Sequence, residues 1–400
     1  MKRLFLIGVL ASVLGAGSAS AQTGSGFINN GYYRVSNVAS SRFIYVTDNK
    51  DYYDMVRDKE DFQAIQLWKD VSRYASDPAS VIYIEQVSSN YFDLRSQATG
   101  VHSLTGYYVG VTKNSDGSYT VSASVTKAGV EVTKYLTDDE QSSSDRGTMG
   151  TKGKLNYRKW IVDKIETGHA TNYFGIKPTI ELDGKYYRPF YADFPFKTSS
   201  PGMHVYYVDE VQSKYAVMKE IYGEVPAGTP VLIECASDNP SENRLELLVS
   251  SSASVSGNLL GGVYFCNGGR PVESVDAYTV FDAGSMRVFS VVDGQLVLTD
   301  SAPERLSEIK VIDAATYNQI KLKCLPANTC YLKSDGDTPS QVPVFVDGQV
   351  PDAIGGVSAE REATAGGVYS LSGTQLRNTS DVEGLPAGLY IVGGRKTVVR

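Results

Sequence analysis

Five Asp-Gly pairs divide this 400-residue chain and constrain its fold more than any other feature. They lie at 116–117, 183–184, 293–294, 335–336 and 347–348. Asp-Gly suits two-residue hairpin turns, because both central positions need positive φ. Neighbouring segments such as SYTVSAS, KYYRPFYA and QLVLT alternate with period two, and sustained 3.6-residue periodicity is hard to find. The sequence therefore predicts an all-β protein with at most short helices.

One phrase occurs three times: VPAGTPVLIE at 225–234, LPANTCYLK at 325–333 and LPAGLYIV at 385–392. In each copy an apolar residue precedes a proline, whose fixed φ suits the second position of a turn. Alanine, then glycine or asparagine, leads into an alternating strand. Since proline cannot donate to a ladder, it belongs at the entry of the strand. We interpret the phrase as repeated architecture that launches strands from tight turns.

The first 21 residues predict a secretory signal peptide. Lys2 and Arg3 precede the apolar run LFLIGVLASVLGAG, which closes on Ala19-Ser20-Ala21. We therefore expect a mature chain from about Gln22, secreted or held at the cell surface. This run is too short for a membrane helix, and no later run reaches the roughly 18 to 20 apolar residues that spanning requires.

The mature chain is acidic. Loss of the two cations of the signal leaves 38 − 2 = 36 Lys and Arg against 45 Asp and Glu, a formal charge of −9. This balance disfavours nucleic acid and anionic membranes as partners.

The cysteines fall in the second half of the chain, and three disulfide pairings are possible among them. A disulfide is the expected use in an exported protein, because no C-x-x-C is present and zinc sites prefer closely spaced ligands. We expect no metal and no cofactor. The disulfide candidates are Cys235, Cys266, Cys324 and Cys330.

The first third of the mature chain resembles the ricin-type β-trefoil lectins. GYYRVSN, FIYV and AIQLW follow one another over about forty residues, as in one repeat of that family, and Gln66-Leu67-Trp68 matches its Q-x-W phrase. Trp160 in YRKWIVDKI also resembles the Trp of this phrase, although Arg158 replaces the expected Gln. The segment 27–165 has the length of one trefoil.

The resemblance implies a carbohydrate site at Trp68, Gln66 and Tyr45. In the family the Trp stacks on sugar, the Gln offers hydrogen bonds, and an Asp on the preceding strand binds hydroxyls. Tyr45 stands where that Asp would be, which removes a charged acceptor. The alternative is that Gln66 and Trp68 only form the fold, since a half-buried Trp contributes a large apolar area wherever it packs.

Tyrosine doublets offer a second source of aromatic surface. Neighbouring strand residues point to opposite faces, so one Tyr of each pair can be buried while the other faces outward. Outward Tyr suits carbohydrate, protein partners and ordinary cross-strand pairs. The doublets lie at 32–33, 52–53, 107–108, 186–187 and 206–207.

The remaining chain resembles modules of secreted Bacteroidota proteins of largely uncharacterised function. Residues 172–340 resemble a β-sandwich module, and 341–362 change to Gly, Ala and charge, which predicts a linker. Residues 363–400, with VYSLSG and GLYIV before a basic end, resemble C-terminal sorting segments of the type IX kind. The resemblance implies recognition by secretion or surface-attachment machinery; a closing hairpin of the sandwich is the alternative.

Catalytic motifs are absent from the sequence. His102, His169 and His204 lack metal-ligand spacing, and no G-x-S-x-G elbow, P-loop or G-x-G-x-x-G occurs. A catalytic pair of carboxylates, as in glycosidases, remains an alternative, because the distance between two carboxyl groups cannot be read from sequence. The candidates, chosen by their aromatic surroundings, are Glu85, Asp93, Glu181 and Asp193.

These observations favour a non-enzymatic binding protein, with glycan as the leading ligand class. One alternative is a surface adhesin or structural module that binds other proteins through its tyrosines. The other is a glycoside hydrolase, or another hydrolase, with a carboxylate pair that no motif reveals.

Overall fold

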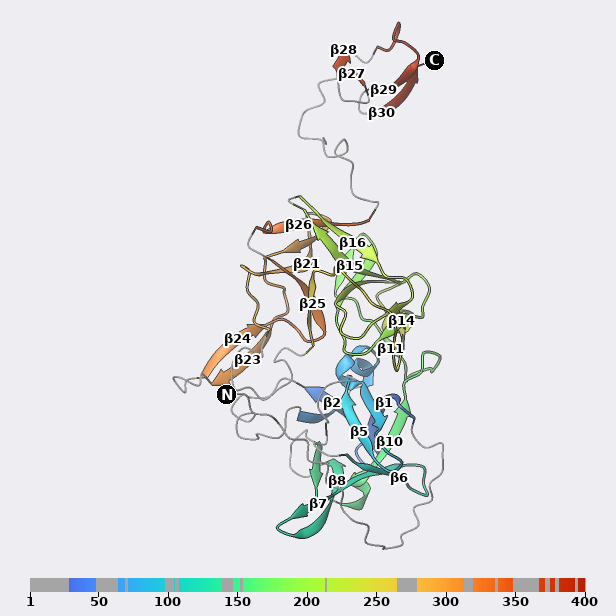
Figure 1. Cartoon of the computed structure of the whole chain (residues 1–400), viewed down its shortest axis with the longest axis vertical. Helices are drawn as coiled ribbons and strands as arrows, with labels where there is room; N and C mark the ends of the chain where they lie inside the picture. The colour runs from blue at the N-terminus through green and yellow to red at the C-terminus, as the bar shows by residue number, and fades with distance from the viewer. Residues whose placement is uncertain are drawn as a thin grey trace. The chain divides into compact units, whose positions relative to one another are not determined.

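The computed structural model (Figure 1) describes residues 29–47, 64–68, 71–97, 104, 108–138, 147–151, 154–212, 214–264, 279–312, 319–334, 337–347, 367–370, 375–377, 381–392 and 395–399. The predicted signal peptide, 1–21, lies outside these ranges. The chain divides into two compact units, Met1–Phe345 and Val346–Arg400. Within the described ranges, no helix is both long and apolar enough to cross a membrane.

Six strands at the start of the first unit pair antiparallel into a closed ring. Around the ring, β1 pairs with β4, β4 with β5, β6 with β7, β7 with β10, and β10 with β1. The bridge between Phe92 and Val109 joins β5 to the residue before β6. Closure removes the open edges of the sheet. The strands are β1 (Gly31–Asn37), β4 (Ile82–Gln86), β5 (Phe92–Ser96), β6 (Gly110–Lys113), β7 (Tyr119–Lys127) and β10 (Lys159–Lys164).

Two hairpins extend this barrel. The strand β2 (Phe43–Thr47) pairs with β3 (Ala64–Trp68) and attaches to β1, and β8 (Val130–Asp138) pairs with β9 (Gly147–Gly150) and attaches to β7. A six-stranded barrel with added hairpins is the β-trefoil arrangement, so the predicted trefoil-like fold is confirmed. Short 3₁₀ helices complete it: η1 (Val71–Ser76), η2 (Pro78–Ser80) and η4 (Leu155–Arg158).

The barrel interior is the first hydrophobic core. Its aliphatic residues include Val35, Ile84 and Leu94, each almost fully buried. Trp160 is also completely buried there, and its indole N–H donates to the carbonyl of Leu136 at 3.0 Å. Trp160 is therefore a core residue whose polar atom is satisfied within the barrel.

The rest of the first unit is a sandwich of two antiparallel sheets, which confirms the predicted β-sandwich. Ten strands follow the order β12-β13-β18-β15-β16-β26-β22-β21-β25-β20, and four follow β11-β19-β14-β17. The small hairpin β23 (Ser307–Ile312) with β24 (Gln319–Cys324) is a separate sheet, and η5 (Pro240–Glu242) lies before β19. The sandwich strands are β11 (Phe174–Gly175), β12 (Ile180–Leu182), β13 (Lys185–Phe190), β14 (Phe196–Thr198), β15 (His204–Val211), β16 (Ala216–Glu220), β17 (Glu224–Val225), β18 (Val231–Cys235), β19 (Arg244–Leu247), β20 (Leu260–Val263), β21 (Met286–Val292), β22 (Gln295–Thr299), β25 (Thr329–Lys333) and β26 (Gln341–Val346).

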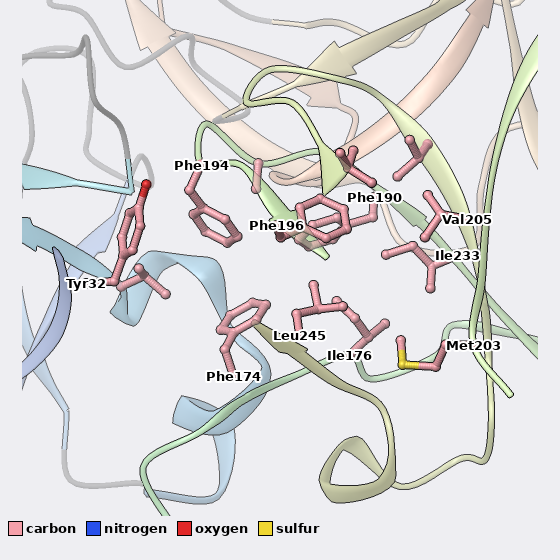
Figure 2. Packing of buried hydrophobic residues seen from close by; sticks show 14 of the residues in the cluster. Tyr32, Phe174, Ile176, Phe190, Phe194, Phe196, Met203, Val205, Ile233 and Leu245 are labelled. Atoms are coloured by element: carbon pink, nitrogen blue, oxygen red, sulfur yellow. The ribbon is translucent and has the colours of Figure 1, made fainter. Parts of the chain in front are cut away.

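A second hydrophobic core fills the space between the two sheets (Figure 2). Phe190 of the larger sheet and Phe196 of the smaller sheet meet edge to face, with ring centroids 5.7 Å apart. Phe194 contacts Phe174 in the same way at 5.5 Å. Such tilted ring pairs add about 0.5–1.5 kcal/mol beyond the area that they bury.

The barrel contributes residues to this second core. Tyr32 contacts Phe194 with ring centroids 5.6 Å apart, while its neighbour Tyr33 belongs to the first core. Because β1 has a core on each side, both tyrosines of this doublet are buried, contrary to the expected inside-outside arrangement. The predicted boundary between 27–165 and 172–340 remains a prediction, and both segments lie within one compact unit.

The other described doublets differ from this one. At 186–187 and 206–207, one tyrosine is buried and its neighbour is half-buried, as expected for strands with a single covered face. Tyr108 is 61% exposed. Tyr107 and the doublet at 52–53 lie outside the described residues.

Two Asp-Gly pairs form the predicted hairpin turns. Asp183 and Gly184 join β12 to β13 with φ of 49° and 78°, and Asp293 and Gly294 join β21 to β22 with φ of 50° and 72°. Positive φ at both central residues is the signature of a type I′ turn.

The repeated phrase forms the predicted turn in two of its copies. Gly228 before β18 and Asn328 before β25 occupy equivalent positions, with φ of 70° and 56°. Asn is one of the few residues other than Gly that tolerates this region. In the third copy, Gly388 has no positive φ and begins strand β29 directly.

The structure corrects the start of the predicted linker, 341–362. Residues 341–346 form β26, which pairs with β22 inside the ten-stranded sheet. Its sequence QVPVFV buries Val342 and Val344 on one face, an alternation that indicates a strand.

The second compact unit contains a four-stranded antiparallel sheet in the order β28-β27-β29-β30. Leu389 lies opposite Val398, and both side chains are exposed. The short C-terminal β segment is thereby confirmed. Its strands are β27 (Val368–Ser370), β28 (Gln375–Arg377), β29 (Gly388–Val392) and β30 (Arg395–Val399).

Candidate functional site

The hairpin β2–β3 carries all three residues predicted to bind carbohydrate. Its register places Tyr45 directly opposite Gln66 and Phe43 opposite Trp68. Opposite residues in an antiparallel pair are close neighbours. The structure therefore brings Tyr45 and Gln66 together, with Trp68 two residues further along β3. Ligand binding by these residues remains a prediction.

The base of this hairpin is tied to the barrel by polar groups. Arg42, just before β2, forms a buried ion pair with Asp138 at the end of β8, and its Nε donates to Asp138 Oδ2 at 3.1 Å. Asn37 accepts the backbone N–H of Ala39 at 2.9 Å. The Phe43 ring packs against Tyr74 with centroids 4.2 Å apart. These contacts fix where the hairpin leaves the barrel.

A second candidate site lies on the outer face of the barrel, on β4 and β5. Glu85 lies opposite Asp93, and Arg95 follows two residues later. The Arg95 Nε donates to Asp93 Oδ2 at 2.8 Å, and its Nη2 lies 2.9 Å from Glu85 Oε2. Burial acts to lower the pKa of Arg95, but the bond to Asp93 and both carboxylate charges raise it overall. One guanidinium thus holds two carboxylates, leaving a net charge of −1.

Two exposed tyrosines border this cluster. Tyr91, two residues before Asp93, is 50% exposed, and Tyr108 is 61% exposed. The antiparallel bridge between Phe92 and Val109 places Tyr108 opposite Asp93. Glu85, Tyr91, Asp93, Arg95 and Tyr108 are called the β4–β5 face below.

The remaining carboxylate candidates do not join this face. Glu181 on β12 is exposed. Asp193 is half-buried between β13 and β14, and burial raises its pKa to about 6. Its charge contributes to raising the pKa of Tyr32, although burial is the larger cause. Of the four predicted candidates, the register brings Glu85 and Asp93 together.

The described histidines are occupied by local contacts. The Nδ1 of His169 accepts the backbone N–H of Asn172 at 2.8 Å, and the Nδ1 of His204 lies 2.7 Å from Glu220 Oε1. His102 lies outside the described residues. No group of three or more His, Cys, Asp or Glu suited to a metal ion occurs among the residues that the structure describes.

Two of the predicted disulfide residues are thiols in this structure. Cys235 and Cys330 are buried and free, and the Cys330 thiol donates to the carbonyl of Val231 at 3.2 Å. Burial raises the pKa of both thiols to about 12. In this structure the two cysteines pack as small apolar residues and do not form the expected disulfide. Cys324 is buried as well, and Cys266 lies outside the described residues, so pairing that involves Cys266 remains a prediction.

Sequence reasoning did not identify Arg95 or Tyr91. The signal was present in FDLRS, where Asp93 and Arg95 alternate with the core residues Phe92 and Leu94. Alternation indicates a polar outer face on this strand. The partner Glu85 follows only from the pairing of β4 with β5, which the sequence does not give.

Comparisons with known proteins give no close relative. No protein-family model and no curated protein matches the chain. Among solved structures, the Polyporus squamosus lectin bound to a human-type influenza-binding epitope has a TM-score of 0.25 at 12% identity and covers 35% of this chain. The chain spans 50% of that lectin. The Rhizoctonia solani agglutinin has a TM-score of 0.20 at 15% identity, with 34% of this chain and 96% of that chain covered. A mosquitocidal holotoxin has a TM-score of 0.26 at 11% identity. That match covers 86% of this chain and 36% of the holotoxin chain.

Proposed function

We propose that this protein is a secreted or cell-surface binding protein whose trefoil-like barrel binds carbohydrate without catalysing a reaction. The observation that carries the proposal is the register of β2 and β3. It sets Tyr45 opposite Gln66 and places Trp68 on the same strand as Gln66, on a hairpin that projects from a closed barrel.

The residue types suit a sugar. An indole or phenol face stacks on the C–H face of a pyranose ring, and an amide both donates and accepts hydrogen bonds. The Tyr45 hydroxyl can also donate and accept, so it supplies a neutral group in place of a carboxylate. Hydrogen bonds from neutral groups that face water give modest affinity. A glycan that carries several copies of the sugar would bind more tightly through avidity.

A glycan array screened with the chain from Gln22 to Arg400 tests this function. Trp68→Ala should weaken binding on the array while the thermal unfolding curve stays that of a folded protein. Tyr222→Ala, which removes an 82% exposed aromatic ring from the sandwich, is the matched control and should bind as the parent does. A blank array, or unchanged binding by folded Trp68→Ala, would overturn the proposal.

We also propose that the C-terminal sheet is the part of the chain that secretion or surface-attachment machinery recognises. The exposed pair Leu389 and Val398 on neighbouring strands supports this proposal, because a small sheet with exposed apolar residues favours a docking partner. A chain that ends at Val346 should fold and be exported but be lost from the cell surface. Unchanged surface display of this shortened chain would contradict the proposal.

A further inference from the structure

The β4–β5 face contains a buried acceptor that the protein does not use. Asp93 is 4% exposed, and its Oδ2 accepts from Arg95. Its Oδ1 is buried and has no hydrogen-bond partner among the described residues. A buried carboxylate oxygen without a donor destabilises the fold, because it has lost its hydrogen bonds to water. An oxygen kept in this condition therefore points to a donor supplied from outside the fold.

The surroundings of Asp93 provide the rest of a binding site. Tyr108, opposite Asp93, and Tyr91, two residues before it, offer exposed rings. The Glu85 side chain is 33% exposed, so its carboxylate can also accept from a ligand. Arg95 holds both carboxylates in place before any ligand arrives, which lowers the entropy cost of binding.

The charge and shape of this face select among ligand classes. Two carboxylates and one guanidinium leave a net charge of −1, which disfavours anionic ligands. The guanidinium between the carboxylates also repels an incoming cation. A neutral ligand that has hydroxyl donors on one edge and an apolar C–H face for a tyrosine ring satisfies both demands.

We propose that the β4–β5 face is a second carbohydrate site, which takes a neutral pyranose through hydroxyl bonds to Asp93 and Glu85 and stacking on Tyr108. This inference extends the proposed glycan binding but uses none of the residues of the β2–β3 hairpin. The two sites lie in one compact unit, so a branched or repeated glycan could engage both.

Four forms of the chain from Gln22 to Arg400 separate the two sites: the parent, Trp68→Ala, Tyr108→Ala and the double variant. The probes are the methyl glycosides of galactose, glucose and N-acetylglucosamine, detected by saturation-transfer NMR. We expect Trp68→Ala to retain a signal with at least one glycoside and the double variant to lose it. Asp93→Asn replaces one acceptor by a donor, and it should weaken the remaining binding at least about tenfold.

The outcomes distinguish this inference from the proposed function. If the NMR signal is lost in Tyr108→Ala and kept in Trp68→Ala, all binding occurs at the β4–β5 face and the proposed hairpin site is wrong. Signal lost completely in folded Trp68→Ala would overturn the second site and leave the hairpin. No signal with the parent would overturn both. Tyr108 is largely exposed, so its removal should not unfold the protein, and Tyr222→Ala again serves as the control.

Discussion

Arg34 donates from Nη1 to Oδ1 of Asn172 at 2.7 Å, which ties barrel strand β1 to the segment that enters the sandwich. The same guanidinium donates to the carbonyls of Tyr173 and Tyr74 at 2.8 Å. Arg34 is buried, and burial lowers its pKa to about 10, so it remains charged at neutral pH. This residue satisfies three acceptors on two separate segments, η1 and residues 172–173.

Replacing Arg34 by Met should lower the free energy of unfolding by about 3–5 kcal/mol, because two buried acceptors and one part-buried acceptor lose their donor. Urea denaturation measures this loss. Lys159→Met is the control: Lys159 pairs with Asp116 at 2.6 Å on the surface, and its loss should cost less than about 1 kcal/mol. Equal effects of the two variants would contradict the role given to Arg34.

Tyr32→Phe and Tyr33→Phe should change stability in opposite directions. The Tyr32 hydroxyl is buried without a hydrogen-bond partner among the described groups, so its removal should stabilise the fold by about 1 kcal/mol. The Tyr33 hydroxyl donates to the carbonyl of Asn29 at 2.8 Å, and its removal should cost about 1 kcal/mol. Thermal unfolding of the pair tests both signs, and a loss of stability in Tyr32→Phe would refute the first.

Asp193 should make the protein less stable as pH rises from about 4 to about 6. Burial raises its folded pKa to about 6, above that of an unfolded Asp, so the folded state binds the proton more tightly in this window. Stability from the neutral carboxyl is then lost on ionisation. Asp193→Asn should remove this dependence, and its gain in Tm over the parent should grow from pH 4 to 6.5. A gap between the two Tm values that does not change with pH would exclude this role.

Cys235 and Cys330 should resist alkylation in the folded protein. With a pKa of about 12, only about one thiol in ten thousand is ionised at pH 8, and the thiolate is the reactive form. Iodoacetamide labelling followed by peptide mass analysis should find both unmodified before denaturation and modified after it. Recovery of either peptide as a disulfide, or rapid labelling of the native chain, would contradict the finding that both cysteines are free thiols buried in the fold.

The sequence predicts local structure well where one residue type determines the backbone. Asp183-Gly184 and Asp293-Gly294 specify their turns, because few other pairs adopt positive φ twice in succession. The trefoil-like barrel followed from the spacing of GYYRVSN, FIYV and AIQLW through a family resemblance. β26 could have been found from the alternation in QVPVFV, but the glycine-rich residues after it suggested a linker.

Long-range pairing explains what the sequence could not give. β1 pairs with β10 across more than a hundred residues, and no local pattern in either strand names its partner. The doublet Tyr32-Tyr33 suggested one buried and one exposed ring, and the structure buries both because a sheet from a later segment covers the outer side. The β4–β5 face likewise depends on a register that places Glu85 opposite Asp93.

The position of β1 between two cores has a consequence for the order of events during synthesis. The barrel cannot close until β10, at Lys159–Lys164, has left the ribosome. Even then the outer side of β1 stays uncovered until β19, at Arg244–Leu247, has followed and the second core can assemble. For that interval the nascent chain presents Tyr32, Val81 and Tyr83 as an apolar patch. A chaperone that binds such patches has its natural target there, and a barrel cut from the chain at Ile165 would carry the patch permanently.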